Sequence, residues 1–147
     1  MKAQGKAWTC GIAAVSNALE CLGIRRTQGQ VAALCHTSPD AGTDEEELKR
    51  ALLACGCGVD EWEFALEALS KDWLRQHLYR RGPVVLCMDN FEHWVTCIGV
   101  CGDSYTVFDP ALGMGLRVYS WAGLKTRWCL SRAKDGPIYY ALGVNRP

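Results

Sequence analysis

The chain has 147 residues, a length typical of one domain. Its 49% hydrophobic and 22% charged residues suffice for a core and exclude global disorder. Sixteen basic and sixteen acidic residues cancel, which excludes the strongly basic surface of a nucleic-acid-binding protein. No apolar run reaches the roughly 18 residues that span a bilayer, and residues 1–6 lack the apolar segment of a signal peptide. We expect no membrane insertion.

Nine cysteines are many for this length, and the number is odd. Because no signal peptide is visible and the core can stand without crosslinks, we expect free thiols and a cytoplasmic location. Most of these cysteines lie in apolar stretches, where a thiol behaves as a small buried hydrophobe. The spacings Cys55-x-Cys57 and Cys97-x3-Cys101 do not fit paired zinc ligands, so we expect no metal and no cofactor.

Helical periodicity extends to about Leu78. Thr43 and Glu46 form a capping box, with Thr43 as the N-cap, and Gly56 stands where a helix-ending glycine belongs. Gly82 and Pro83 end the last helix of this half. The spacing predicts four helices, over residues 9–22, 28–35, 44–55 and 70–81.

The second half is rich in β-branched and apolar residues at strand spacing. A hairpin turn is expected near Gly102, and a short helix or turn over 121–128. The predicted strands cover residues 84–88, 93–101, 105–109, 116–119 and 138–144. This order predicts an α+β fold in one domain, 1–147, with a helical lobe over about 1–82 and an antiparallel sheet over about 83–147.

Cys10 differs from the other cysteines because it is placed in the first turn of a predicted helix. Unpaired backbone N–H groups and the positive end of the helix dipole stabilise a thiolate there. Small neighbours such as Gly11 leave room for a substrate. Cys10 is therefore a candidate nucleophile, and the alternative is a buried structural thiol.

A nucleophilic thiol needs a base, and the chain offers three histidines. His36 reads as a solvated loop residue and His77 as a packing residue inside a helix. His93 opens a predicted strand, and Asp109 ends the next one. In a hairpin that turns near Gly102 these two residues fall almost opposite each other, where cross-strand side chains meet. Asp109 would then orient His93 so that its second ring nitrogen faces the thiol.

Gln4 lies six residues before Cys10 and is the candidate for the fourth part of the site. A side-chain amide donor beside the backbone N–H of Cys10 would form an oxyanion hole. The alternative is a disordered glutamine near the chain end.

Several short motifs follow one another in a specific order: Gln4-x5-Cys10-Gly11-x-Ala13, Gly42-Thr43, Pro83-Val84-Val85-Leu86, His93-Trp94-Val95, Phe108-Asp109-Pro110-Ala111-x-Gly113 and Trp128. In this order and spacing they resemble the papain-like peptidase domain of bacteriocin-processing transporters. Those peptidases cut after a double glycine in a leader peptide. The resemblance extends from Gln4 to about Trp128.

The resemblance implies a papain-like cysteine peptidase fold, with an N-terminal helical lobe followed by a C-terminal antiparallel sheet. It implies Cys10 as nucleophile, His93 as base and acid, Asp109 as the residue that orients His93, and Gln4 as oxyanion donor. The implied partners are a peptide or protein substrate, in particular a leader peptide, and the peptide-export machinery.

Some features depart from the family pattern. Thr9 stands where members usually have aspartate, and the strand 138–144 has no clear counterpart. These departures leave the double-glycine substrate open. Two other functions also remain open. One is deamidation or acyl transfer on a protein partner by the same triad, and the other is a non-catalytic leader-binding module.

Overall fold

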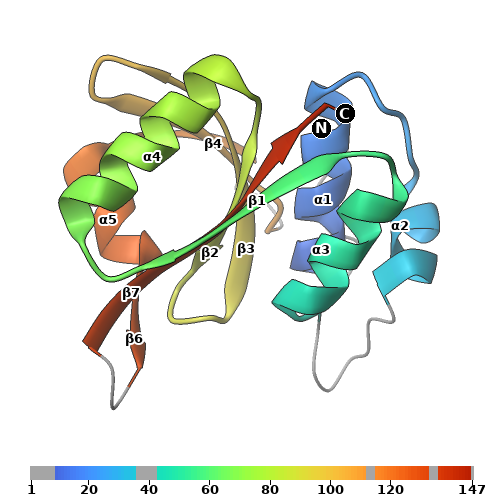
Figure 1. The fold of residues 1–147 in the computed structure, drawn as a ribbon, viewed down its shortest axis with the longest axis horizontal. Helices are drawn as coiled ribbons and strands as arrows, with labels where there is room; N and C mark the ends of the chain where they lie inside the picture. Colours follow the sequence, from blue (N-terminus) through green and yellow to red (C-terminus); the bar gives the residue numbers. More distant parts are fainter. Residues whose placement is uncertain (1–8, 36–42, 112–114, 133–135, 147) are drawn as a thin grey trace.

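The computed structural model describes residues 9–35, 43–111, 115–132 and 136–146. Helices dominate the first half of the chain and strands the second (Figure 1). The elements in chain order are α1 (Cys10–Cys21), α2 (Gln28–Cys35), α3 (Glu45–Ala54), β1 (Gly58–Phe64), α4 (Glu67–Arg80), β2 (Val84–Met88), β3 (His93–Cys101), β4 (Ser104–Asp109), β5 (Gly115–Ser120), α5 (Trp121–Trp128), β6 (Cys129–Arg132) and β7 (Gly136–Asn145).

The strands of the described residues form one sheet in the order β1-β7-β2-β3-β4-β5, and β6 pairs with β7. All the pairings are antiparallel. The consecutive strands β2, β3, β4 and β5 follow one another in the sheet, whereas β7 inserts between β1 and β2. The strands that carry His93 and Asp109, β3 and β4, are therefore direct neighbours.

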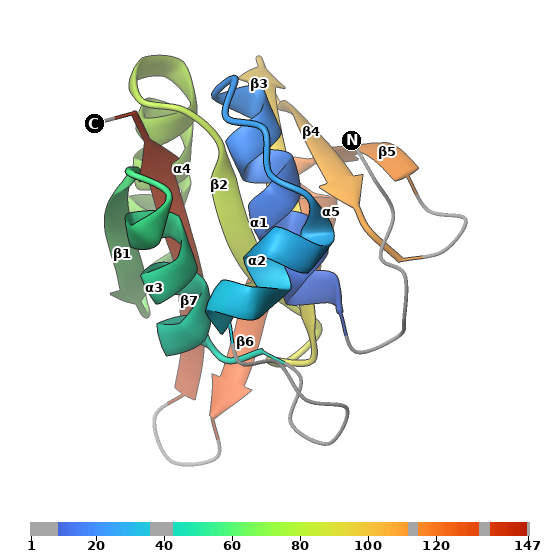
Figure 2. The ribbon, with the colours of Figure 1, turned by 90° about the vertical axis from the view of Figure 1, so that its right-hand side faces the viewer.

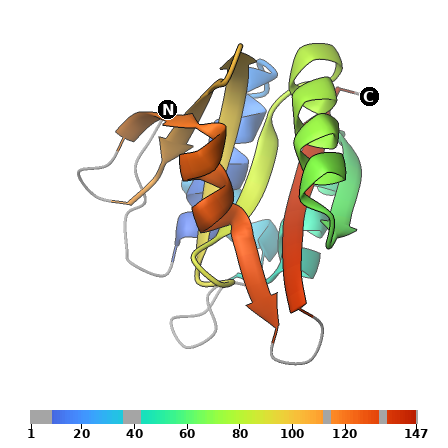
Figure 3. The same ribbon diagram turned by 90° about the vertical axis from the view of Figure 1, so that its left-hand side faces the viewer.

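Helices cover both faces of the sheet. The α1, α2 and α3 layer lies on one face (Figure 2), and α4 and α5 lie on the other (Figure 3). Every residue of β2 is buried, because Val85 and Cys87 enter the core under α1 while Val84, Leu86 and Met88 enter the core under α4 and α5. Burial on both faces explains why this strand is a continuous apolar run.

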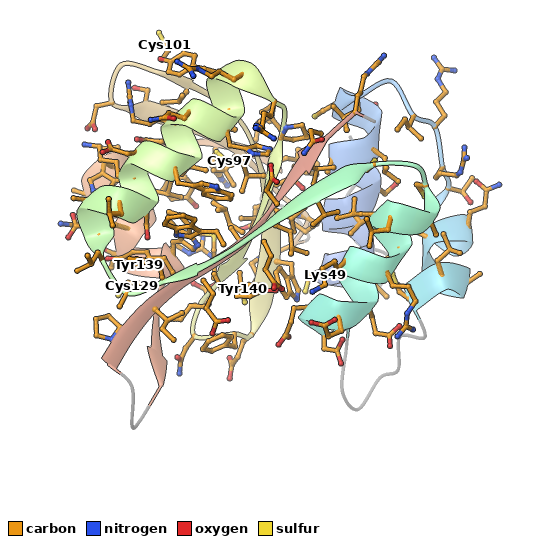
Figure 4. All side chains as sticks on the ribbon, viewed as in Figure 1. Lys49, Cys97, Cys101, Cys129, Tyr139 and Tyr140 are labelled. Atoms are coloured by element: carbon orange, nitrogen blue, oxygen red, sulfur yellow. The ribbon has the colours of Figure 1, made fainter. Side chains whose placement is uncertain are left out.

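The same alternation is visible in β7. Tyr139 packs with Trp128 on the α5 side, with ring centroids 5.2 Å apart, whereas Tyr140 packs with Trp94 on the α1 side, with centroids 6.2 Å apart. Figure 4 labels the two tyrosines on β7. The hydroxyl of Tyr140 donates a hydrogen bond to Glu61 of β1. These two aromatic contacts anchor the last strand in both cores.

The α+β class is confirmed, and so are the predicted helices α1 and α2, the helix α5 and the five predicted strands, with boundary shifts of two residues or fewer. The predicted helix over 70–81 begins earlier, at Glu67. The expectation of helical structure up to Leu78 is wrong for residues 58–64, which form β1. The sequence also gave no prediction for β6.

The predicted N-cap of α3 is wrong by one residue. Asp44 is the N-cap, and its side chain accepts a hydrogen bond from the backbone N–H of Glu47 at 2.9 Å. Thr43 is buried, and its carbonyl accepts a hydrogen bond from the indole of Trp94 at 3.2 Å. Since Thr43 belongs to the core, the exposed aspartate beside it caps the helix.

None of the helices in the part of the chain that the structure describes is long and apolar enough to cross a membrane.

Candidate active site

Cys10 is the first residue of α1, with Thr9 as the N-cap, and the residue is 8% exposed. The first intrahelical hydrogen bond runs from the N–H of Ala13 to the carbonyl of Thr9, so the N–H groups before Ala13 have no helical acceptor. The positive end of the α1 dipole lies at the same place. The sulfur thus lies where a helix favours negative charge.

His93 and Asp109 come together at the far end of the β3–β4 hairpin. Thr96 of β3 pairs with Phe108 of β4, and the register shifts by one residue between Cys97 and Gly99. Asp109 is thereby diagonal to His93, and Nε2 of His93 donates to Oδ1 of Asp109 over 2.6 Å. The cross-strand contact that the hairpin argument predicts is present.

The Asp109 carboxylate is almost wholly removed from water, with 1% of the residue exposed. Burial alone raises the pKa of this carboxyl. Hydrogen bonds from His93 and from the backbone N–H of Ala111, at 3.0 Å, lower this pKa, and so do the positive charges of His93 and Arg127. Together these effects outweigh burial. The pKa of Asp109 therefore lies below its usual range, and the group is an anion at neutral pH.

His93 is a half-buried imidazole with a partner on each side. Burial lowers the pKa of the ring, but side-chain hydrogen bonds with Asp109 and Cys10 oppose it and raise the pKa to about 9. Because Asp109 engages Nε2, the nitrogen left for the thiol of Cys10 is Nδ1. Three side chains from α1, β3 and β4 thus form one continuous chain of polar contacts.

The other candidate residues lie elsewhere. Gln4 and His36 are outside the described residues. His77 is buried in α4, where a ring nitrogen contacts the carbonyl of Val144 at 3.2 Å, and it takes no part in the contacts of Cys10. Its predicted role as a packing residue is confirmed.

Arg127 is a member of this constellation that the sequence did not indicate. It lies in the last turn of α5, with Nη1 3.6 Å from Oδ2 of Asp109. An arginine near a helix end is common on protein surfaces, so its type and position gave no signal. Only the fold brings it next to the Asp109 carboxylate.

The described residues include no group of three or more histidine, cysteine, aspartate or glutamate side chains that could hold a metal ion. All nine cysteines lie in the described ranges, and all are free thiols. What the constellation offers is a thiol, an imidazole and a carboxylate, the groups of nucleophilic catalysis with general acid–base support.

No protein-family model and no curated protein matches the sequence. Solved structures do match. One is a double glycine motif protease from an AMS/PCAT transporter in complex with the leader peptide, with a TM-score of 0.72 at 20% identity over 99% of this chain and 89% of that one. Another is the peptidase domain of Streptococcus ComA, a bi-functional ABC transporter involved in quorum sensing, with a TM-score of 0.77 at 14% identity over 99% and 97% of the two chains.

A third similar structure is the N-terminal peptidase C39 like domain of the toxin secretion ATP-binding protein from Vibrio parahaemolyticus. Its TM-score is 0.61 at 13% identity, over 99% of this chain and 100% of that chain. At these identities the likeness concerns the fold. The chain has the papain-like α+β fold of C39 peptidase domains over nearly its whole length, which confirms the predicted fold and the resemblance.

Proposed function

We propose that this protein is a cysteine peptidase in which Cys10 is the nucleophile, His93 the general acid and base, and Asp109 the residue that orients His93. One observation carries the proposal: the same imidazole contacts a helix-start thiol on one side and a buried carboxylate on the other. The shared fold with C39 peptidase domains supports it independently.

In the first half of the reaction, His93 holds the proton of the thiol as an imidazolium, and the Cys10 thiolate attacks the carbonyl carbon of the scissile peptide bond. The carbonyl oxygen becomes an oxyanion. His93 then gives its proton to the leaving nitrogen, the C–N bond breaks, and the new amine leaves. A thioester between Cys10 and the acyl half of the substrate remains. Asp109 stabilises the imidazolium while it carries the proton.

The oxyanion needs hydrogen-bond donors at the start of α1. The backbone N–H of Cys10 is one of the groups without a helical acceptor, so it is available to donate. By the family resemblance, the side-chain amide of Gln4 is the second donor. Two donors share the charge that develops only during the attack, which favours the transition state over the bound substrate.

In the second half, water replaces the amine. His93 takes a proton from the water, the hydroxide attacks the thioester, and the C–S bond breaks to give a carboxylic acid and the Cys10 thiolate, with His93 again protonated. Atoms and charges are then as at the start, and the enzyme can turn over.

For the substrate we propose a leader peptide cut after a double glycine, presented by peptide-export machinery. One structural neighbour is described as a double glycine motif protease in complex with the leader peptide, and another belongs to a bi-functional ABC transporter. The nine free thiols suit a reducing compartment, so we place the reaction in the cytoplasm.

The test is cleavage of synthetic leader peptides that contain Gly-Gly, compared among wild type, Cys10→Ala and Cys21→Ala. Cys21 is a matched control because it is an exposed thiol at the other end of the same helix. We expect wild type and Cys21→Ala to cleave equally and Cys10→Ala to be inactive. Mass spectrometry should find two products whose masses sum to the peptide plus one water.

Cleavage that survives Cys10→Ala would refute the proposed mechanism. A one-dalton change at an amide, or a crosslink between two chains, would show deamidation or acyl transfer in place of hydrolysis. Tight binding of the peptide by wild type without any product would show a binding module. A peptide whose Gly-Gly is replaced by two bulky residues tests the substrate class separately.

A further inference from the structure

Arg127 connects three parts of the fold next to the proposed active site. Its guanidinium forms a two-pronged ion pair with Asp89, with Nε 2.9 Å from Oδ1 and Nη2 2.6 Å from Oδ2. Nη1 donates to the hydroxyl of Tyr119 on β5 at 2.7 Å and faces Asp109 at 3.6 Å. The carbonyl of Arg127 also accepts a hydrogen bond from the N–H of Asp89 at 3.0 Å.

Asp89 begins the connection between β2 and β3, whose backbone is unusual. Asp89, Asn90 and Phe91 have φ angles of +52°, +58° and +72°, and all three carry side chains. Residues other than glycine rarely adopt this left-handed conformation, and it persists only where surrounding contacts hold it. The connection leads directly into His93, the first residue of β3. The conformation of this connection therefore determines the position of the His93 imidazole.

The contacts of Arg127 are suited to holding this connection. A planar guanidinium bonded to both carboxylate oxygens of Asp89 fixes an orientation as well as a distance, which a lysine cannot do. The backbone bond between Asp89 and Arg127 adds a third point of attachment. The end of α5 thus fastens the first left-handed residue of the connection.

The second contact concerns the buried carboxylate. Oδ1 of Asp109 already accepts from His93 and from the N–H of Ala111. The other oxygen, Oδ2, faces Nη1 of Arg127. The charged groups around Asp109 are thus His93 from β3 and Arg127 from α5. Arg127 in turn meets Asp89 from the β2–β3 connection and Tyr119 from β5. A buried anion needs such compensation.

We infer that Arg127 is a positioning residue of the proposed triad, which supports Asp109 from the side opposite His93 and holds the β2–β3 connection that presents His93. This inference rests on the proposed function. The two parts of the role are separable, because Asp89 takes part in one and Asp109 in the other.

The test compares four variants. Arg127→Met keeps the aliphatic stem and removes the charge, and Arg127→Lys keeps the charge without the planar fork. Asp89→Asn weakens the hold on the connection but leaves Arg127 facing Asp109. Arg50→Met is the matched control, because Arg50 forms an exposed ion pair with Glu47 on α3, a helix that carries none of the triad residues.

Two readouts are used. The first is the rate of Cys10 alkylation by iodoacetamide as a function of pH, which needs no substrate. Cys10 and Cys21 share one tryptic peptide, so tandem mass spectrometry must separate them. The second is kcat and KM for the Gly-Gly leader peptide.

Without the Arg127 charge, Asp109 takes up a proton at a higher pH, and the protonated carboxyl no longer stabilises the imidazolium. In Arg127→Met we expect the acidic limb of the alkylation profile to move up by about one pH unit. We expect kcat to fall about ten- to a hundredfold, with KM changed less than about threefold. Asp89→Asn should lower kcat while leaving the limb in place, and Arg127→Lys should do the same. Arg50→Met should match wild type.

The inference is overturned if the acidic limb of the alkylation profile lies at the same pH in Arg127→Met as in wild type. It is also overturned if a folded Asp89→Asn protein has the kcat of wild type. Circular dichroism of each variant shows whether it is folded. If Arg127→Met does not fold, kcat of Arg127→Lys and Asp89→Asn still tests the hold of Arg127 on the β2–β3 connection. If wild type cleaves no leader peptide, the proposed function fails, and the alkylation profiles still report on Arg127.

Discussion

Thr96 of β3 donates a hydrogen bond from its hydroxyl to the backbone carbonyl of Ala14 in α1, over 2.8 Å. Both residues are wholly buried. The bond joins the helix that begins with Cys10 to the strand that begins with His93, across 82 positions of sequence. This hydrogen bond fixes the position of α1 along the axis of β3, and therefore the position of the Cys10 thiol relative to the His93 imidazole.

Thr96→Val should therefore affect both stability and catalysis. Valine has nearly the same shape but no hydroxyl, and losing one buried hydrogen bond costs about 1 kcal/mol of unfolding free energy. We expect kcat to fall at least about threefold, since catalysis is sensitive to small displacements of the reacting groups. Thr126→Val is the matched control, because its hydroxyl donates to the carbonyl of Ala122 within one exposed helix turn, also at 2.8 Å. Equal effects of both substitutions on kcat would contradict the expected coupling.

Asp109→Asn should change the pH dependence of cleavage as well as its rate. Burial lowers the pKa of His93, and the contacts with Asp109 and Cys10 raise it to about 9. Because the imidazolium must donate a proton to the leaving amine, wild-type kcat/KM should decline as the pH rises through about 9. Without the carboxylate charge the pKa falls and this limb moves to lower pH, with a loss of about 10²-fold in rate near pH 8.

Asp60→Asn is the control for that experiment. Oδ2 of Asp60 lies 3.6 Å from Nδ1 of His77, so the substitution alters a second histidine–aspartate pair, at the opposite edge of the sheet. Its alkaline limb should coincide with that of wild type. A limb that moves in neither variant would show that Asp109 does not set the protonation of His93.

His77 should make the protein less stable in mild acid. Burial lowers the pKa of this ring, outweighing its bond to the Val144 carbonyl and the charge of Asp60. The unfolded chain takes up a proton near the ordinary histidine pKa of about 6.5, and the folded chain does so only at lower pH. The stabilisation is therefore complete above about pH 6.5 and is lost as the pH falls through the folded pKa.

Urea unfolding at pH 8 and pH 5 tests this expectation on wild type and His77→Gln. Glutamine keeps a donor for the Val144 carbonyl but does not titrate. The drop in unfolding free energy from pH 8 to pH 5 should be smaller in the variant. An equal drop in both proteins would place the acid sensitivity on other groups.

Gly143 of β7 should not tolerate a side chain. A Cβ atom there would lie 2.5 Å from Cε1 of His77, well inside van der Waals contact. Since His77 is buried, we expect Gly143→Ala to lower the unfolding free energy by about 1–3 kcal/mol. Gly99→Ala on β3 is the matched control, because no atom lies within 4 Å of a Cβ at that position. Thermal unfolding midpoints that agree for the two variants would contradict the clash.

Sequence patterns predicted the elements whose burial is dictated by their own residues. The apolar run of β2 is buried on both faces, and the glycine turn at Gly102 joins β3 to β4 in the register that unites His93 with Asp109. Strand β1 was missed because it is an edge strand of acidic and half-exposed residues. It is a strand because β7 pairs with it along its whole length, a contact between residues far apart in sequence.

In the candidate site, too, local sequence predicted some contacts, whereas others depend on tertiary packing. His93 and Asp109 lie on consecutive strands, so counting from a turn was enough to bring them together. Arg127 reaches Asp109 only because α5 packs on the face of the sheet opposite α1, and no spacing rule encodes that packing. The left-handed residues Asp89, Asn90 and Phe91 were likewise invisible, since their backbone is held by tertiary contacts.

The position of β7 in the sheet has a consequence for biosynthesis. This strand, the last element of the fold, pairs with β1, β2 and β6, so it links the first strand to the rest of the sheet. Until Asn145 has emerged from the ribosome, the nascent polypeptide lacks this link between β1 and β2. We therefore expect the sheet that carries His93 and Asp109 to be completed only after β7 has been translated.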